Sequence, residues 1–410
     1  MTEYGPTPLA RTPVSDRTST DPVRILRVIA RMNGGAAYSV AVLAGRVDPV
    51  RYPSLLVHGT LARDESSELW RAEREGCRRV VVKQLGPEIR PLTDLWAVVR
   101  LVRLVRHWRP DIVETHTAKA GVVGRLAAVL ATRPRPVIIH TYHGHVLEGY
   151  FGRTKSMIYR QAERWLARIS DTLVAVSDGT ADDLVRLRVA ERQRFRVINL
   201  GLDLQPFMAD LQDAAASVRA RLAVPESGLL LVFVGRLVPI KRVDVLLRAL
   251  GRLRDAATPV HLAIAGAGGS RADLEQLSVE LGLQRHVTFL GHMQDVTAVT
   301  AAADIAVLSS DNEGTPMSLI EAGAAGKPSV ATAAGGVPEV VLDGLTGRLI
   351  ERGDDRAMAD AIRQLAEDPR MRARMGAQAR SHVLERYSSR RLVHDVETLY
   401  EDLLRQRGLC

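Results

Sequence analysis

The chain predicts an α/β protein with two domains, each built on a doubly wound parallel sheet. Three observations indicate this class. Short apolar runs alternate with amphipathic helical stretches over most of the 410 residues. The alternation begins again after Gly201-Leu202-Asp203-Leu204, a stretch typical of a domain crossover. Glycine-rich or charged loops follow several apolar runs, at the strand ends where parallel sheets bind ligands.

Length and composition indicate a globular protein with room for two cores. Hydrophobic residues make up 46% and charged residues 25%, which is ordinary for a globular chain. The two cysteines, Cys77 and Cys410, provide neither a disulfide framework nor a metal cluster, which suits a reducing cytoplasm. Residues 1–21 lack the apolar core of a signal peptide, and we expect a disordered tail there. No apolar run reaches about 18 residues, so no transmembrane helix is predicted.

Charge is divided unevenly along the chain. Residues 1–205 carry 32 Lys and Arg against 21 Asp and Glu, a net of +11, whereas residues 206–410 carry 24 against 26, a net of −2. A basic domain attracts an anionic partner, such as a membrane, a diphosphate-linked lipid or nucleic acid. The alternative is a composition set by a GC-rich genome. Aromatic residues are only 4% and mostly stand apart from the arginines, which argues against nucleic acid as the partner.

The first domain is predicted over residues 22–203. Its strands are expected at 23–30, 55–59, 79–82, 111–115, 137–141, 171–176 and 196–200. Gly34 and Gly35 lie between the first strand and a helix from Tyr38, where glycine lets a ligand approach the backbone closely. Many tight turns look the same, so this pair alone is a weak signal.

A basic amphipathic helix is predicted from Leu92 to Trp108. Its main apolar face consists of Val98, Leu101, Val102, Leu104, Val105 and Trp108. The other face carries Arg100, Arg103 and Arg106 together with Leu92, Trp96 and Val99. Such a helix can lie on the cytoplasmic face of a membrane. The alternative is an ordinary helix that packs on its sheet and leaves its arginines in solvent.

Two successive strands of this domain end in histidine. His116 follows one strand and His143 the next, with Lys119 close to the first. Because parallel strands end at the same edge of a sheet, we expect both rings in one polar site. A single histidine at a strand end is usually structural. The chain contains neither His-Glu-x-x-His nor Cys-x-x-Cys, so no metal site is predicted.

The second domain is predicted over residues 204–388. Its strands are expected at 229–234, 261–265, 287–290, 305–308 and 329–332, with a short one within 344–350. Arg236 and Lys241 stand on the loop after the first of these, where both can bind a diphosphate. The alternative is an exposed basic loop. The glycines at 266–269 lack the spacing of a dinucleotide fingerprint, so we expect a tight turn and no redox cofactor. A terminal helix from Ser389, within 389–410, is long enough to return to the first domain.

The stretch from Asp304 to Val340 predicts strand, loop, helix and strand. Thr315 is expected to cap the helix and Pro316 to be its first residue. Free N–H groups at a helix start attract phosphate. Glu313 and Glu321 lie on either side of that helix start, and carboxylates there accept hydrogen bonds from hydroxyls, which suggests a sugar nucleotide. The alternative is a capping acid and an ordinary surface glutamate.

Taken together, these motifs resemble the retaining glycosyltransferases of family 4, over residues 23–405. The resemblance rests on VGRLVPIKRVDVLLRAL, LAIAGAGG, FLGHM and NEGTPMSLIEAGAAGKPSVATAAGGVPEVV, which includes a Glu-x7-Glu pair. It implies the GT-B fold, in which two Rossmann-like domains face each other across a cleft. In the first domain, ETHTAKAGVVGRLAA and HTYHGHVLEGYF resemble the bacterial subgroup that builds exopolysaccharide, capsule or O-antigen chains.

The resemblance implies a set of donor contacts in the second domain. Arg236 and Lys241 would hold the diphosphate, Glu321 the ribose and Glu313 the transferred sugar. Backbone amides would surround sugar and phosphate at Thr315, Met317 and Ser318, and the backbone at Met293 would meet the base. Many members have Phe-Gly-Leu where this chain has Thr315-Pro316-Met317, so Pro316 removes one backbone donor.

The resemblance also implies roles in the first domain. His143 would lie near the reacting sugar carbon, and Gly34 and Gly35 would lie at the acceptor side near the diphosphate. His116 and Lys119 are candidate acceptor contacts by position.

The function so implied is transfer of a sugar from a nucleoside diphosphate, with UDP favoured, to a saccharide or polyprenyl-diphosphate-linked acceptor. No cofactor is expected. No Asp-x-Asp occurs, so we expect a reaction that does not depend on metal. Two alternatives stay open: a GT-B epimerase or phosphorylase, and a basic-faced binding protein without catalysis.

Overall fold

The computed structural model describes residues 21–61, 68–86, 88, 90–144, 153–254 and 259–408. The chain forms two compact units, which we call unit 1 (Met1–Gly201 with Ser389–Cys410) and unit 2 (Leu202–Ser388). The predicted domain boundary lies two residues later. Leu202 belongs to unit 2 because its N–H donates to the Tyr387 carbonyl at 2.7 Å. Of the expected disordered tail, residues 1–20 lie outside the described residues.

Unit 1 is built on a parallel sheet with the order β3-β2-β1-β4-β5-β6-β7 among the described residues. Its strands are β1 (Ile25–Ile29), β2 (Ser54–His58), β3 (Arg79–Val81), β4 (Ile112–His116), β5 (Val137–Tyr142), β6 (Thr172–Ala175) and β7 (Phe195–Val197). The strand order reverses between β1 and β4, as it does in Rossmann-like sheets. The loops after these two strands therefore mark the expected ligand site of unit 1.

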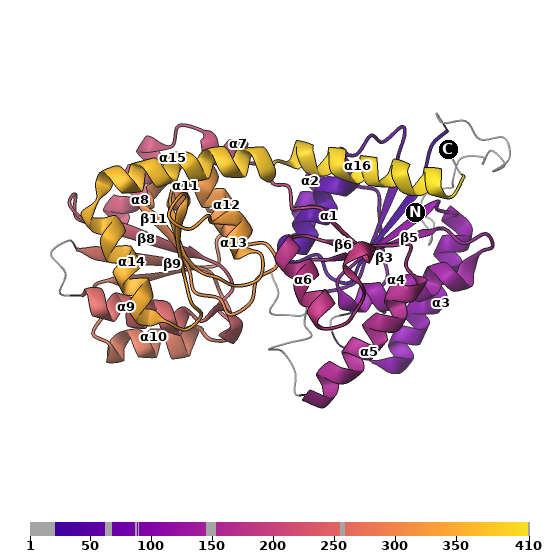
Figure 1. The fold of residues 1–410 in the computed structure, drawn as a ribbon, viewed down its shortest axis with the longest axis horizontal. Helices are drawn as coiled ribbons and strands as arrows, with labels where there is room; N and C mark the ends of the chain where they lie inside the picture. Colours follow the sequence, from indigo (N-terminus) through magenta and orange to yellow (C-terminus); the bar gives the residue numbers. More distant parts are fainter. Residues whose placement is uncertain are drawn as a thin grey trace. The chain divides into compact units, whose positions relative to one another are not determined.

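Helices cover both faces of this sheet (Figure 1). One layer contains α3 (Pro91–Trp108), α4 (Ala118–Ala131) and α5 (Arg153–Ile169). The other contains α1 (Gly34–Arg46), α2 (Leu69–Arg74) and the terminal helix α16 (Ser389–Gln406). A further helix, α6 (Asp178–Arg186), packs beside β6 and β7.

The two faces of β1 differ in chemistry. Leu26 and Val28 belong to the apolar core under α3 and α4. Because side chains alternate along a strand, Arg27 points to the opposite face. There it is fully buried beside Glu114 of β4, its partner in register, with Arg27 Nε 3.2 Å from Glu114 Oε2.

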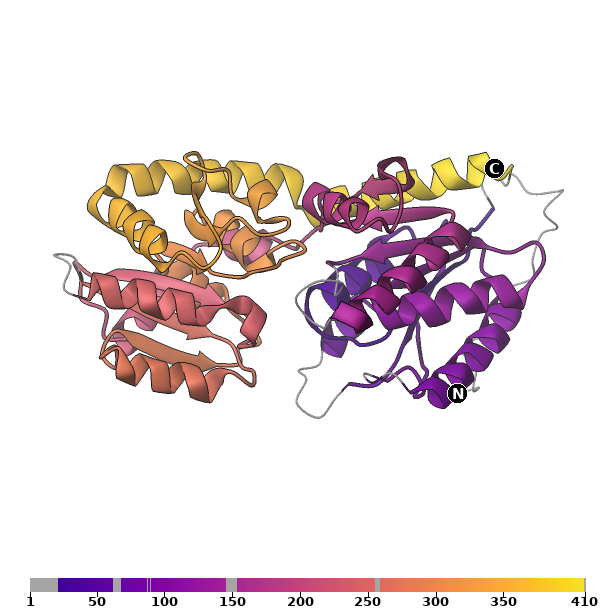
Figure 2. The ribbon, with the colours of Figure 1, turned by 60° about the horizontal axis from the view of Figure 1, so that its bottom comes forward.

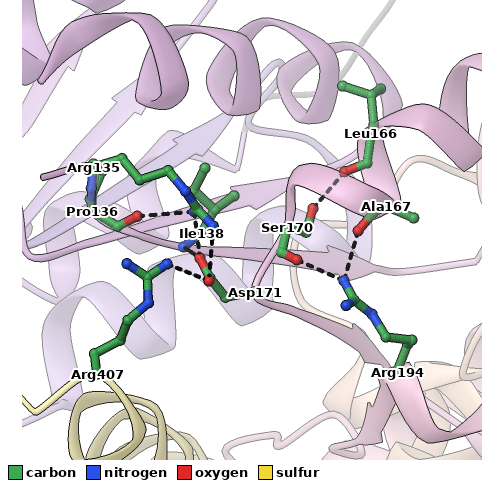
Figure 3. Close-up of polar contacts among 9 residues, drawn as sticks. All are labelled: Arg135, Pro136, Ile138, Leu166, Ala167, Ser170, Asp171, Arg194 and Arg407. Atoms are coloured by element: carbon green, nitrogen blue, oxygen red, sulfur yellow. Dashed lines mark hydrogen bonds and ion pairs between the residues drawn. The ribbon is translucent and has the colours of Figure 1, made fainter. Parts of the chain in front are cut away.

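The terminal helix α16 is fastened to unit 1 by polar contacts along its length. Arg391 donates to the carbonyls of Asn199 and Leu200 at 2.8 and 2.7 Å. Tyr400, fully buried, donates to Glu114 Oε2 at 2.7 Å. Just past the helix, Arg407 contacts Asp171, which also binds Arg135 at 2.7 and 3.1 Å (Figure 3).

Unit 2 has a second parallel sheet, with the order β10-β9-β8-β11-β12-β13 in the described part of the chain. Its strands are β8 (Leu229–Val234), β9 (Val260–Ala265), β10 (Val287–Gly291), β11 (Ile305–Leu308), β12 (Ser329–Thr332) and β13 (Gly347–Ile350). Its helices are α7 (Gln205–Met208), α8 (Gln212–Arg221), α9 (Val243–Leu253), α10 (Arg271–Glu280), α11 (Thr297–Ala302), α12 (Met317–Ala324), α13 (Val337–Val340), α14 (Asp355–Glu367) and α15 (Pro369–Arg386). The sheet lies between a layer with α9, α10 and α14 and a layer with α8, α11, α12 and α15 (Figure 2).

The predicted class, two Rossmann-like parallel-sheet domains, is confirmed, and several helix starts are corrected. The sequence predicts helix starts at Tyr38 and Val122, whereas α1 begins at Gly34 and α4 at Ala118, each four residues earlier. Gly34 and Lys119 therefore lie in first helical turns, and Gly34 accommodates a φ of +63° there. The predicted cap of α12 is also wrong: Pro316, not Thr315, is the N-cap, and the helix starts at Met317.

Candidate active site

In unit 2 the strand order reverses between β8 and β11, so the loops that follow these strands lie at the expected ligand site. The β8–α9 loop carries Arg236 and Lys241, and the β11–α12 loop carries Glu313 and Thr315. The sequence-predicted donor residues therefore converge on one edge of this sheet.

The β8–α9 loop is held by the turn that follows β9. Leu237 N–H donates to the Ala267 carbonyl at 2.8 Å, and Ser270 N–H donates to the Leu237 carbonyl at 3.0 Å. A Cβ on Gly266 would lie 1.8 Å from the Gly235 carbonyl oxygen, so only glycine permits this approach. The glycine-rich turn thus fixes the backbone on both sides of Arg236, whose side chain is exposed.

Lys241 and Glu313 form an ion pair between the two loops, through Lys241 Nζ and Glu313 Oε1. Both side chains are largely buried, with 17% and 10% exposed. The same oxygen accepts from Ser310 Oγ at 2.6 Å, and Ser309 Oγ donates to the Lys241 carbonyl at 3.0 Å. The two charged residues are therefore held in place by contacts within unit 2.

Further contacts, not foreseen from the sequence, support this pair. Arg242 lies 3.2 Å from Asp311 across the same two loops. Gly335 adopts a φ of +52°, and a Cβ there would lie 1.8 Å from the Glu313 carbonyl oxygen. The adjacent Gly336 N–H donates to that carbonyl at 3.2 Å. The Gly335-Gly336 pair at the end of β12 was the available sequence signal.

The start of α12 offers backbone donors. The Pro316 carbonyl accepts from Leu319 and Ile320 N–H at 3.1 and 3.3 Å. The amides of Met317 and Ser318 precede these and have no partner inside the helix. Glu321 lies one turn further along α12 and is half-buried.

Met293, predicted to lie near the base, follows β10 and packs its side chain against the apolar cluster under α11. Its side chain is half-buried, so its position is set by the core of unit 2.

Unit 1 brings the two predicted histidines together. His116 ends β4 and His143 follows β5, and His116 Nδ1 lies 3.0 Å from His143 Nε2. Burial lowers the pKa of His116 to about 3, with a further contribution from the Arg27 charge. Burial and then the neighbouring His116 lower the pKa of His143 to about 3. Both rings are therefore neutral near pH 7.

Lys119 is not in contact with this pair. Its ammonium lies 2.7 Å from Asp94 Oδ1 of α3 and also donates to the Glu88 carbonyl. The side chain is 13% exposed. The structure therefore gives Lys119 a role in joining α4 to α3.

Glu114, which the sequence analysis missed, lies beneath the histidines. Its Oε1 is 3.6 Å from His116 Nε2 and its Oε2 binds Arg27 and Tyr400. The available signal was a charged residue inside a strand that is otherwise buried on both faces.

Large apolar side chains are exposed on the α3–α5 layer. The predicted apolar face of α3 is buried, including Leu101, Leu104, Val105 and Trp108. Leu92, Leu95 and Trp96 at its other face are 79%, 61% and 62% exposed. On α5, Met157, Ile158 and Trp165 are also exposed. No helix among the described residues is long and apolar enough to cross a membrane.

Two family models match the chain. The one described as Glycosyltransferase Family 4 matches residues 33–206, and the one described as Glycosyl transferases group 1 matches residues 216–382. The chain belongs to the family 4 glycosyltransferases of the GT-B fold. A D-inositol 3-phosphate glycosyltransferase from Saccharomonospora viridis is 34% identical to this glycosyltransferase over 312 residues, which cover 72% of this chain and 70% of that protein. EpsD from Bacillus subtilis, also named a glycosyltransferase, is 29% identical over 305 residues, or 73% of this chain and 79% of EpsD.

Solved structures share the fold of this glycosyltransferase. HepE from Anabaena, in complex with UDP and glucose, has a TM-score of 0.79 at 23% identity, over 92% of this chain and 99% of HepE. A sucrose-phosphate synthase from Thermosynechococcus elongatus has a TM-score of 0.79 at 21% identity, over 94% and 100% of the two chains. At these identities the likeness shows the GT-B fold alone.

Proposed function

We propose that this glycosyltransferase moves a sugar from UDP to an acceptor hydroxyl with retention of the anomeric configuration. The observation that carries the proposal is the convergence of Arg236, Lys241, Glu313 and the start of α12 at the reversal point of the unit 2 sheet. The fold neighbour HepE, solved with UDP and with UDP-glucose, supports UDP as the nucleotide. Configuration of the product linkage, read from its anomeric NMR coupling, tests retention; an inverted linkage would contradict it.

The donor contacts follow from charge and hydrogen-bonding capacity. Arg236, exposed on its loop, and Lys241 bind the diphosphate, and the Met317 and Ser318 amides add neutral donors. Glu321 accepts from the ribose hydroxyls, and Glu313 accepts from the sugar. Thr315 and Met293 contribute backbone contacts to the sugar phosphate and the base. In unit 1, Gly34 and Gly35 border the diphosphate, and His143 lies beside the sugar.

The proposed reaction needs no carboxylate nucleophile. The acceptor oxygen bonds to the anomeric carbon on the face from which the phosphate oxygen leaves. The leaving phosphate oxygen takes the acceptor proton, so UDP departs with its charge neutralised by Arg236 and Lys241. Glu313 positions the sugar, in keeping with its ion pair to Lys241. A sugar covalently bound to Glu313, trapped and found by mass spectrometry, would overturn this role.

We propose that the diphosphate is neutralised without a metal ion and that no cofactor takes part. The described residues contain no group of three His, Cys, Asp or Glu side chains arranged to hold a metal. Activity should survive EDTA treatment. Activity lost in EDTA and restored by Mg²⁺ or Mn²⁺ would refute the proposal.

The proposed acceptor is a polyprenyl-diphosphate-linked saccharide or another polysaccharide precursor, met at the cytoplasmic face of a membrane. The exposed Leu92, Trp96 and Trp165 and the net charge of +11 on residues 1–205 support contact with an anionic bilayer. Sedimentation with vesicles containing anionic lipid tests this contact. A protein that remains in the supernatant, with equal activity on soluble saccharides, would reject it.

A second acceptor class has its own support. Relatives are named for D-inositol 3-phosphate and for L-malate, which are small anions, and the first half of this chain is basic. Assays with the donor fixed and with inositol phosphate, malate and a lipid-linked saccharide as competing acceptors distinguish the two classes.

The first experiment is a donor hydrolysis screen with UDP-, GDP- and dTDP-sugars. The proposal expects release of UDP and its loss in Arg236→Ala. An epimerase would convert the sugar nucleotide without an acceptor, and a phosphorylase would require inorganic phosphate. A binding protein would hydrolyse no donor.

A further inference from the structure

A line of polar side chains connects the buried core of unit 1 to His143. Glu114 and His116 lie two residues apart on β4 and so share one face of the sheet. Glu114 Oε1 is 3.6 Å from His116 Nε2, and His116 Nδ1 is 3.0 Å from His143 Nε2. The contact between Glu114 and His116 is an electrostatic one, because His116 Nε2 is buried without a hydrogen-bond partner among the described residues. The same is true of His143 Nδ1, at the end of this line.

One oxygen of Glu114, Oε2, is held by an ion pair and by a hydrogen bond. Arg27, fully buried, lies 3.2 Å from Glu114 Oε2, and Tyr400 donates to that oxygen at 2.7 Å. Arg27 also donates to the Tyr400 hydroxyl oxygen at 2.9 Å. Glu114 Oε1, which faces His116, is an acceptor in the carboxylate that forms the ion pair with Arg27.

This acceptor determines where the single proton of each neutral ring sits. A proton on His116 Nε2 faces the carboxylate, whereas a lone pair there would face it with repulsion. His116 Nδ1 is then bare and must accept from His143 Nε2–H. The remaining nitrogen of His143, Nδ1, is left without a proton.

We propose that Glu114 is a positioning residue that acts through His116 and makes His143 Nδ1 a hydrogen-bond acceptor for a substrate hydroxyl. The identity of the ligand as a substrate hydroxyl rests on the proposed function, whereas the proton positions on the two rings do not. A bare Nδ1 accepts from a sugar or acceptor hydroxyl, whereas a protonated Nδ1 would donate to the oxygen of that hydroxyl.

The test is an imidazole ¹⁵N NMR spectrum of the full chain without ligand, with signals assigned by His116→Gln and His143→Gln. The ¹⁵N shifts and ring-proton couplings separate protonated from bare nitrogens. We expect His116 and His143 each to carry the proton on Nε2. A proton on Nδ1 of His143 would overturn the proposal, whatever the activity of the protein.

The Glu114→Gln variant should reverse the proton positions on both rings. Tyr400 donates to Oε2 and the Arg27 guanidinium lies beside it, so this side retains the amide oxygen and the amide NH₂ turns toward His116 Nε2. The protons should then move to Nδ1 in both rings, with kcat falling more than tenfold. Tyr400→Phe is the matched control, because it removes one donor to the same carboxylate but keeps its charge. In Tyr400→Phe, the protons of the His116 and His143 rings should stay on Nε2. Unchanged proton positions in Glu114→Gln would contradict the proposal, and if that variant does not fold, the wild-type spectrum alone decides.

Discussion

The ammonium of Lys241 and the carboxylate of Glu313 form an ion pair, although they belong to loops that follow different strands of unit 2. Ser310 shares the carboxylate oxygen, and Ser309 holds the Lys241 backbone. The pair lies at the point where the strand order of the sheet reverses. In the proposed donor site, the diphosphate would therefore share the charge of Lys241 with Glu313.

Replacing this lysine should impair donor use strongly. Lys241→Ala removes a cation and leaves the Glu313 carboxylate uncompensated beside the diphosphate. We expect kcat/KM for the donor to fall by about 10²- to 10³-fold, the usual effect of losing one group that stabilises developing charge. Steady-state rates with varied UDP-sugar measure this.

The control for Lys241→Ala is Arg248→Ala, on the exposed side of α9. It also removes one cation near the β8–α9 loop but should leave kcat/KM unchanged. Lys241 and Glu313 form one ion pair, so their effects should not be independent. The fold-loss of kcat/KM in the Lys241→Ala/Glu313→Gln double variant should therefore be smaller than the product of the fold-losses in the two single variants. Full additivity would argue that the ion pair has no part in donor binding.

Stability should fall as the pH drops below about 6.5, because of His116 and His143. Their folded pKa values, about 3, lie below the ordinary histidine value of 6.5, so both rings bind protons more readily when unfolded. The stabilisation is complete above pH 6.5 and is lost between 6.5 and 3. Each ring contributes up to about 1.4 kcal/mol per pH unit in that range. Urea unfolding at pH 7.5 and 5.5 measures the loss.

The stability of the His116→Gln/His143→Gln variant should depend less on pH over the same range. Part of the dependence should remain, because burial also lowers the pKa of His140 well below 6.5. Asp171 does not interfere: hydrogen bonds from Arg135 and Arg407 outweigh its burial and lower its pKa below 3.8. Its contribution is present above 3.8 and is lost only at lower pH. An equal pH dependence in the variant and the wild type would refute the prediction.

The two contacts that Tyr400 and Arg407 make with unit 1 should contribute unequally to the free energy of unfolding. Tyr400→Phe leaves the buried Arg27 and Glu114 each without one partner and should cost about 1–3 kcal/mol of unfolding free energy. Arg407→Ala removes a partly exposed partner of Asp171, which retains both bonds to Arg135 (Figure 3), and should cost under about 1 kcal/mol. Urea titrations of the two variants provide the comparison, and the reverse order would contradict it.

Local sequence predicted the strands well where an apolar run has sharp ends. The predicted ranges for β8, β11 and β12 agree with the structure residue for residue. The starts of α1 and α4 were placed too late, because glycine and alanine before the apolar stretch resembled a loop. Pro316 was misplaced by one residue, since proline suits several positions at a helix start.

The sequence predicted site contacts only where both residues lie in recognisable local motifs, such as the ends of neighbouring strands. Strand ends predicted that His116 and His143 would meet, and the structure has them 3.0 Å apart. The partner of Lys119, Asp94 on another helix, could not be predicted, because it depends on how α3 packs on α4. The same holds for Tyr400, which reaches Glu114 across 286 residues of sequence.

Gly335, which has no side chain, should be as important for the position of the Glu313 loop as the ion pair between Lys241 and Glu313. At Gly335, a Cβ would lie 1.8 Å from the Glu313 carbonyl oxygen, closer than any real contact, and φ is +52°. Gly335→Ala must therefore displace the Glu313 backbone and should lower kcat/KM by tenfold or more. Gly353→Ala is the matched control: φ is +79°, but nothing lies within 4 Å of its Cβ. It carries the same backbone strain, about 1 kcal/mol or more, without the collision. Both variants should lose thermal stability, but only Gly335→Ala should lose activity. Equal activity in the two variants would mean that the position of Glu313 does not limit the reaction.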